Sequence, residues 1–294
     1  MFEKILLPLD GSELAEVVLP YGEELATRLG SEVILFHVCR PENKQFCHMN
    51  QVYLDGMAEA VRRRMMKRRA KSREVKVKSE VLLGEPVETI CDYVEKNDIG
   101  LMIMGASGAS GFKLWRLGSI TDKVFRTVPI PAMLIRAQKA KGRKKLFNRI
   151  LLPLDGSDAS KAALPVAEEL ATKLKASVTL FRMARRTYIY GQYGEGEPMA
   201  TIDYTKLDAV EEKLARDYLI NTEKELRQKD IAVTHNVVFA TDPANEIIEL
   251  GKRVNADLVV MSTRGRSPIG RWVFGSTAEK VLRQGEIPLI LVRR

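Results

Sequence analysis

Two short motifs that combine aspartate, glycine and serine each occur twice in this chain of 294 residues. The octapeptide Ile5–Ser12, ILLPLDGS, returns unchanged at Ile150–Ser157. The spacing Gly105-x2-Gly108-x9-Gly118-Ser119 returns in the other half as Ser262-x2-Gly265-x9-Gly275-Ser276. Glycines let backbone N–H groups approach an oxyanion without a Cβ in the way, and serine hydroxyls add donors. These residues therefore favour binding of a phosphate-bearing ligand in each half.

A repeat on this scale indicates two copies of one domain. The chain length suits two domains of roughly 140 residues, each large enough to bury a core of its own. We place the domains at 1–138 and 147–294. The basic segment Ala137–Asn148, which has few apolar residues, serves as the linker.

The elements that must position the motifs follow from the apolar pattern. Unbroken apolar runs such as Ile5–Leu9 are typical of strands that are buried on both faces, and they alternate here with helical spacing. An α/β fold with a parallel sheet and helices on both faces is therefore predicted. The strands after the first are expected near Glu32–Val38, Val75–Leu83, Leu101–Met104 and Ala132–Arg136, and at Ser177–Met183, Ala232–Ala240, Leu258–Met261 and Leu289–Arg293.

The helices are predicted with less regular boundaries. One helix is expected from Leu14 to Leu29, closed by Gly30. Residues 40–56 and 184–205 are predicted to be variable connections, followed by helices near Met57–Lys71 and Leu207–Lys229.

Both repeated motifs fall at the carboxyl ends of predicted strands, where open α/β sheets bind ligands. Gly118 lies close to the start of a helix, whose unpaired N–H groups attract phosphate. The first strand is not followed by G-x-G-x-x-G, so the dinucleotide fingerprint is missing. The sequence GxxxxGRW at 265–272 lacks the Lys-Ser/Thr pair of a Walker A loop.

These motifs resemble those of the universal stress protein family, in its ATP-binding branch, and the chain resembles a tandem, two-domain member. The resemblance implies two Rossmann-like, doubly wound domains, each with a five-stranded parallel sheet of order 3-2-1-4-5, related by a pseudo-two-fold axis. It implies ATP, ADP or AMP as ligand, with Mg²⁺ held through the phosphates. The residues that it assigns to the nucleotide in the first half are Pro8, Leu9 and Val38 around the base, Asp10 on the ribose, Met104 beside base or ribose, and Gly105, Ser107, Gly108, Gly118, Ser119 and Ile120 on the phosphates.

The counterparts in the second half are Pro153, Leu154, Asp155, Met183, Met261, Ser262, Arg264, Gly265, Gly275, Ser276 and Thr277. Ser262 departs from the family pattern, which has glycine there. With a negative φ at this position serine would cost little conformational free energy, whereas a positive φ would strain or reshape the loop. Arg264 and Arg266 could pair with phosphate in compensation. We therefore expect two adenine-nucleotide sites of unequal affinity.

Other chemistries have less support. His37, Cys39, Cys47 and His48 are the residue types of a zinc or copper site, but Arg182 and Ala184 stand opposite His37 and Cys39 in the repeat, and no metal site is expected. No nucleophile–base pair is repeated, and a ribose contact explains Asp10 and Asp155 without catalysis. Slow ATP hydrolysis or phosphotransfer remains as an alternative to a binding function.

Charge and cysteine content concern partners and location. Of the net charge of +9, +7 falls in residues 1–145 and +2 in the rest. The excess near Arg62–Lys78 could bind nucleic acid or lipid, or could be a solvated helix face. Three cysteines do not suggest a disulfide framework, and Met1–Lys4 lacks the start of a signal peptide, so a cytoplasmic protein is expected.

The function implied is an adenine-nucleotide-binding regulatory protein of the stress response, acting on a client that the sequence does not name. In this family the domains pair through their last strands, so Ala132–Arg136 and Leu289–Arg293 are predicted to lie antiparallel. That pairing would also cover two exposed apolar edges. A homodimer of the whole chain is expected as well.

Overall fold

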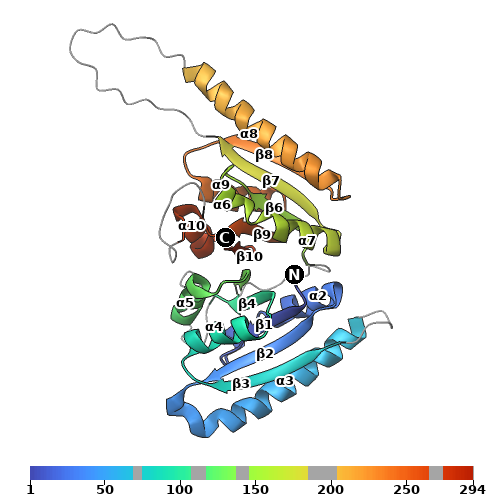
Figure 1. The fold of residues 1–294 in the computed structure, drawn as a ribbon, viewed down its shortest axis with the longest axis vertical. Coiled ribbons are helices and arrows are strands. Elements are labelled where there is room, and N and C mark those ends of the chain that lie inside the picture. Colours follow the sequence, from blue (N-terminus) through green and yellow to red (C-terminus); the bar gives the residue numbers. More distant parts are fainter. Residues whose placement is uncertain (69–74, 107–116, 137–145, 185–203, 265–273, 294) are drawn as a thin grey trace, which may run out of the picture.

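The structure is a computed structural model that describes residues 1–68, 75–106, 117–136, 146–184, 204–264 and 274–293. The described strands form a ten-stranded sheet in the order β3-β2-β1-β4-β5-β10-β9-β6-β7-β8 (Figure 1). The strands of the first half are β1 (Lys4–Pro8), β2 (Glu32–Cys39), β3 (Val77–Leu83), β4 (Leu101–Gly105) and β5 (Ala132–Ile135). Those of the second half are β6 (Arg149–Pro153), β7 (Ser177–Ala184), β8 (Val233–Phe239), β9 (Leu258–Ser262) and β10 (Leu289–Val292). Each half has the predicted order 3-2-1-4-5 with parallel pairing, so the fold class is confirmed.

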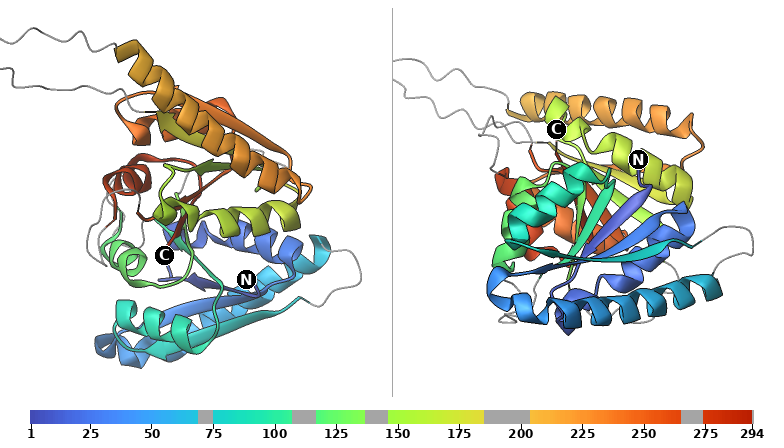
Figure 2. Two further views of the ribbon diagram at one scale, coloured as in Figure 1. Left: turned by 45° about the horizontal axis from the view of Figure 1, so that its top comes forward. Right: turned by 60° about the horizontal axis from the view of Figure 1, so that its bottom comes forward.

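Helices cover both faces of this sheet (Figure 2). Those of the first half are α1 (Glu13–Glu16), α2 (Leu19–Leu29), α3 (Cys47–Arg68), α4 (Pro86–Lys96) and α5 (Ser119–Thr127), with the 3-10 helix η1 at Pro41–Phe46. Those of the second half are α6 (Asp158–Lys161), α7 (Leu164–Leu174), α8 (Tyr204–Arg227), α9 (Pro243–Arg253) and α10 (Ser276–Gln284). Among the described helices, none combines the length and apolar character needed to cross a lipid bilayer.

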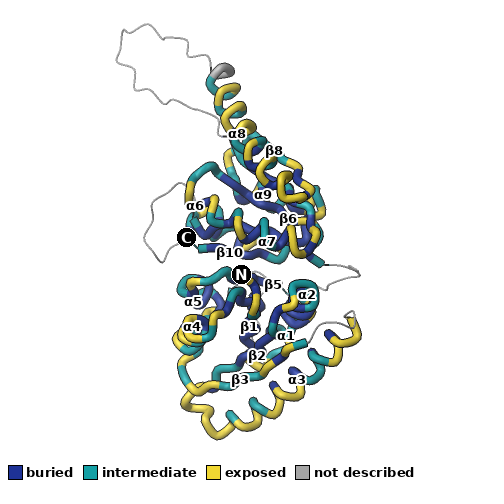
Figure 3. Tube along the Cα trace, turned by 45° about the vertical axis from the view of Figure 1, so that its right-hand side comes forward, coloured by how far each residue is buried: buried dark blue, intermediate teal, exposed yellow. Residues whose placement is uncertain are grey.

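The alternation of side chains along each strand builds two hydrophobic cores. Ile5 and Leu7 face one core, whereas Leu6 faces the other. Each core contains residues of both halves, so each runs the length of the sheet. The strand interiors are buried, and exposed residues lie on the outer sides of α3 and α8 (Figure 3).

The two halves join through the predicted last strands. Ala132, Met133 and Leu134 of β5 pair antiparallel with Leu291, Ile290 and Leu289 of β10, which confirms that prediction. Helices α5 and α10 reinforce the junction with two ion pairs related by the repeat. Arg126 reaches Glu279 at 2.8 Å, and Arg283 approaches Asp122 at 3.6 Å.

A second contact between the halves lies on the opposite face of the sheet. Phe147, at the start of the second half, is fully buried and meets the Tyr21 ring edge-on, with centroids 6.0 Å apart. Its φ of +59° places it in the left-handed region that favours glycine. Arg28 of α2 donates to Leu146 O at 2.6 Å. The buried ring therefore anchors the chain where it enters the second half, at a cost in backbone strain.

Two predicted helix boundaries are wrong, each for a physical reason. The expected helix Leu14–Leu29 is split into α1 and α2, because Pro20 in the first turn of α2 has no N–H and cannot continue a preceding helix. The connection predicted at 40–56 is mostly helical, since α3 begins at Cys47. The first buried residue of α3 is Leu54, so its first two turns have no apolar stripe to reveal them. The other predicted connection lies mostly outside the described residues.

We expect Phe147→Ala to lower the free energy of unfolding by about 3–5 kcal/mol, the usual cost of truncating a buried phenylalanine. Alanine tolerates positive φ no better than phenylalanine, so the loss measures packing alone. Denaturant titration gives the value. Leu214→Ala is the control, because that side chain is 54% exposed and should change stability by less than about 0.5 kcal/mol. A loss below about 1 kcal/mol at Phe147 would contradict this role for the ring.

Candidate functional site

Each half has one of the two cavities described here, at the carboxyl ends of its central strands. The first has a volume of about 640 Å³ and lies at the ends of β1, β2 and β4. The second, of about 140 Å³, lies at the ends of β6, β7 and β9. The strand order reverses between β1 and β4, and again between β6 and β9, which is where open α/β sheets bind ligands. The first volume lies within the range of ligand pockets, about 300–1,000 Å³, whereas the second falls below it.

The structure brings together every predicted site residue that it describes. The first cavity is lined by Pro8, Leu9, Asp10, Val38, Met104, Gly105, Gly118, Ser119 and Ile120. The second is lined by Pro153, Leu154, Asp155, Met183, Met261, Ser262, Arg264, Gly275, Ser276 and Thr277. Ser107, Gly108 and Gly265 lie outside the described residues, as does Arg266. Two motifs that are about 100 residues apart in each half therefore meet in one cavity.

The Asp-Gly-Ser motif forms the same turn in both halves. Asp10 Oδ1 accepts hydrogen bonds from Ser12 N at 3.1 Å and from Ser12 Oγ at 2.6 Å, and Ser12 caps α1. Asp155 Oδ1 accepts the equivalent bonds from Ser157 at 2.9 and 2.6 Å. Gly11, between Asp10 and Ser12, has φ +83°, a conformation that side chains other than glycine rarely adopt. The turn therefore fixes the aspartate at the cavity rim.

The second motif places a helix N-terminus against each cavity. Gly118 and Gly275 are the N-cap residues of α5 and α10, with φ of −60° and −64°. Their own N–H groups donate to Ala106 O and Thr263 O. Because these φ values suit any residue, the backbone conformation does not require glycine at either position. Neither N-cap has a side-chain hydrogen bond to its helix, so the first-turn N–H groups remain available for an anion.

The structure answers the question raised by Ser262. This residue ends β9 and is absent from the described residues with positive φ, and so is Gly105 of β4. Serine is therefore unstrained here, and its Oγ accepts a hydrogen bond from Arg264 N at 3.2 Å. Arg264 lines the second cavity. Burial, with the neighbouring charge of Arg264, lowers the pKa of Arg293, whose guanidinium donates to Phe125 O of the first half.

Sequence reasoning missed several residues that line the first cavity, among them His37, Asn43, Phe46 and Asn50. His37 Nδ1 lies 2.8 Å from Leu9 O. A carbonyl can only accept, so Nδ1 carries the proton and Nε2 accepts from Asn50 Nδ2 at 3.0 Å. The polar ring thus ties α3 to the end of β1. The sequence contained one indication of this position, since His37 adjoins the cavity residue Val38 in the same strand.

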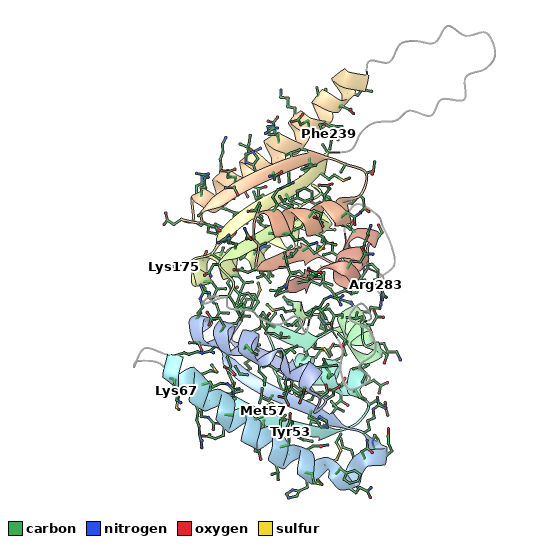
Figure 4. All side chains as sticks on the ribbon, turned by 180° about the vertical axis from the view of Figure 1, so that it is seen from behind. Tyr53, Met57, Lys67, Lys175, Phe239 and Arg283 are labelled. Carbon is green, nitrogen blue, oxygen red and sulfur yellow. A yellow bond between two sulfur atoms is a disulfide. The ribbon has the colours of Figure 1, made fainter. Side chains whose placement is uncertain are left out.

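Tyr53, one turn farther along α3 than Asn50, is labelled in Figure 4. Its hydroxyl donates to a Glu16 oxygen. Burial and the neighbouring Glu16 carboxylate raise the pKa of Tyr53. The phenol therefore remains a protonated donor at physiological pH and is not available as a base.

The structure contains one disulfide, which the sequence analysis did not predict. Cys39, the last residue of β2, and Cys47, the first of α3, are joined by a disulfide. Cys91 is buried and free. In this oxidised state neither bonded sulfur is a thiolate ligand for a metal. Among the described residues, no group of three or more His, Cys, Asp or Glu side chains is placed to hold a metal ion.

The sequence profile of the universal stress protein family matches residues 1–136 and 146–293. The chain belongs to this family. Universal stress protein MJ0531 of Methanocaldococcus jannaschii is 27% identical over 151 residues, which cover 51% of this chain and 85% of that protein. Universal stress protein Rv2005c of Mycobacterium tuberculosis is 25% identical over 222 residues, 76% of this chain and 70% of that one.

A solved universal stress protein from Archaeoglobus fulgidus covers 99% of this chain and 96% of its own length, with a TM-score of 0.68 and 21% identity. The fold of the present chain therefore matches that of the solved protein over both halves.

We expect Gly11→Ala to destabilise the protein by about 1–2 kcal/mol, the cost of forcing an L-residue into the left-handed region. A Cβ at Gly11 would meet no atom within 4 Å, so sterics add nothing to this cost. Gly56→Ala, within α3 and likewise in open space, is the matched control and should stabilise the protein by about 0.5–1 kcal/mol. Thermal or denaturant unfolding compares the two. Equal effects of the two substitutions would show that the turn does not constrain Asp10.

Proposed function

We propose that this universal stress protein is a regulatory protein that binds an adenine nucleotide, ATP, ADP or AMP, in each half. The observation that carries the proposal is the meeting of both repeated motifs in one cavity at the switch point of each half-sheet. Nucleotide occupancy would then alter the conformation of the chain or its assembly into a homodimer. The client remains unnamed.

The residues of the first cavity suit the base, the ribose and the phosphates of such a ligand. An apolar floor that includes Phe36, Ile90 and Met104 suits an adenine ring. Asp10, whose Oδ1 accepts hydrogen bonds from Ser12, would accept hydrogen bonds from ribose hydroxyls. The N-terminus of α5, with Ser119, provides donors for the phosphates. Mg²⁺ would be held through those phosphates.

The second cavity keeps the same arrangement with a different charge. Arg264 lines it, where the first half has no described arginine in its glycine motif. Its smaller volume means that a nucleotide must displace lining atoms in order to enter. We therefore expect the first site to bind adenine nucleotide more tightly.

An enzymatic role has less support from the geometry. Both ring nitrogens of His37 are engaged, and Asp10 Oδ1 already accepts two hydrogen bonds. Lys113 and Arg116, which follow the first glycine loop, lie outside the described residues. Slow ATP hydrolysis is the alternative. Phosphate release that scales with enzyme concentration and is lost with the binding variants below would favour it.

Several described cations of the basic stretch that begins at Arg62 are paired with carboxylates, which lowers the charge that they offer to a nucleic-acid or lipid surface. Arg62 and Arg63 pair with Glu59, and Arg64 lies 2.7 Å from the buried Glu23. Lys78 pairs with Glu32 at 2.9 Å. A cation that is paired with a carboxylate is less available to bind a phosphate group. A steep salt dependence of binding to nucleic acid or anionic vesicles would show that these cations do bind phosphates.

Calorimetric titration with ATP tests the main proposal. Gly118→Val should abolish the first site and spare the second, because a branched side chain at the N-cap would occupy the space of the phosphate; Gly275→Val should do the reverse. Both backbones have φ and ψ in the extended region that valine favours, so folding should be retained. Gly56→Ala controls for a glycine change away from both cavities. The proposal fails if wild type binds no adenine nucleotide with or without Mg²⁺, or if Gly118→Val keeps two unaltered sites.

A further inference from the structure

The Cys39–Cys47 disulfide borders the first cavity through Cys39. Cys39 is one of the cavity-lining residues and is only 1% exposed, whereas Cys47 is half-buried. Their Cα atoms are 5.7 Å apart, and the bond closes a short loop between the end of β2 and the start of α3. One sulfur is thus built into the strand that borders the cavity, and the other is within reach of solvent.

The loop closed by this bond supplies part of the cavity wall. Arg40, Asn43 and Phe46 lie between the two cysteines, and all three line the cavity. None of the residues of η1 is buried, and the Phe46 ring is 47% exposed. The Arg40–Glu42 ion pair in this loop is exposed on both sides and stabilises little. The disulfide is therefore the main tie that holds this part of the wall against the sheet.

A hydrogen-bonded chain continues from the disulfide to the segment after β1 that contains Leu9 and Asp10. Asn50 lies one helical turn after Cys47 and donates to His37, which donates to Leu9 O. Leu9 N in turn donates to Phe36 O at 2.7 Å. A shift of the first turn of α3 would therefore loosen Asn50 from His37, whose bond to Leu9 adjoins the predicted ribose ligand.

We propose that Cys39–Cys47 is a thiol–disulfide modification site that sets the nucleotide affinity of the first half. The inference rests on the proposed nucleotide function and adds its regulation. The closed bond preorganises the loop 40–46, so a bound nucleotide does not have to order it. Opening the bond releases this wall, and the nucleotide must then immobilise side chains such as Arg40 and Phe46 itself. The affinity for ATP should fall roughly three- to tenfold, as expected for ordering one or two flexible side chains.

The reductant is a dithiol. One of its thiolates attacks Cys47 Sγ, the accessible sulfur, so that the Cys39–Cys47 bond breaks and Cys39 leaves as a thiolate that takes up a proton. A mixed disulfide now joins Cys47 to the dithiol. The second thiolate of the reagent attacks the reagent sulfur that is bonded to Cys47 Sγ. Cys47 leaves as a thiolate and is protonated. Two electrons and two protons pass to the protein, and the dithiol becomes a cyclic disulfide.

The repeat provides an internal control. Ala184 ends β7 at the position that Cys39 occupies in β2, and the second half contains no cysteine. The second cavity is lined by the counterparts of the motif residues and cannot carry this modification. Redox control should therefore act on one site of the two.

The experiment measures ATP affinity by calorimetry on full-length protein, oxidised and after reduction with a dithiol. Gly275→Val isolates the first site, and Gly118→Val isolates the second. Alkylation of the denatured protein followed by mass spectrometry should count one free thiol, Cys91, before reduction and three after it. Reduction should weaken the first site roughly three- to tenfold and leave the second within about twofold.

Cys47→Ser in the Gly275→Val background should bind ATP as the reduced protein does, whatever the redox state. Cys91→Ser should keep the full response, because Cys91 is not among the residues that line the cavity and takes no part in the disulfide. Three free thiols in the oxidised protein, or an unchanged first-site affinity after the bond has opened, would overturn the inference and leave the nucleotide function intact. Absence of ATP binding in every variant and both redox states would instead remove the proposed function, and this regulation with it.

Discussion

The antiparallel pairing of β5 with β10 is the constraint on which the rest of the architecture depends. Each half-sheet ends in a short, wholly buried apolar strand, which alone would be an exposed edge prone to aggregation. Pairing the two edges makes one sheet with a continuous core on each face. Since the strands within each half are parallel, the antiparallel junction points the carboxyl ends of the halves in opposite directions. The two cavities therefore lie at opposite ends of the strands of one sheet.

The repeat separates what the backbone requires from what the ligand requires. Gly11 and Gly156 both have positive φ, so the turn itself demands glycine in each half. Gly118 and Gly275 have ordinary φ, so nothing in the backbone demands glycine there. The backbone at these two positions would accept any residue, yet both halves have glycine there. This indicates that the space a side chain would fill is needed for a ligand. Ser262 is a position where a side chain is tolerated in the second half, because its hydroxyl accepts a hydrogen bond from Arg264 N.

Strand positions could be predicted because buried strands leave unbroken apolar runs and the repeat doubled each one, whereas the strand order and the final pairing were expected from the resemblance to the family. The start of α3 could not be predicted, since its first turns bury no apolar residue, and the split between α1 and α2 depends on Pro20 within a continuous apolar pattern. Described site residues from the two motifs lined the cavities as expected. His37 and the disulfide were missed because their partners come from a connection that has no counterpart pattern in the other half.

The distribution of these misses has a physical cause. Motif residues occupy strand ends and helix starts, whose positions the sheet fixes, so their meeting follows from topology. The first cavity is completed by η1 and the first turn of α3, which no core residue anchors. The sequence of such a segment can change without disturbing the fold. Its position depends on local bonds, namely the disulfide and the hydrogen bond from Asn50 to His37. Divergence between the two halves is thus concentrated where the sheet imposes least, at the outer walls of the cavities.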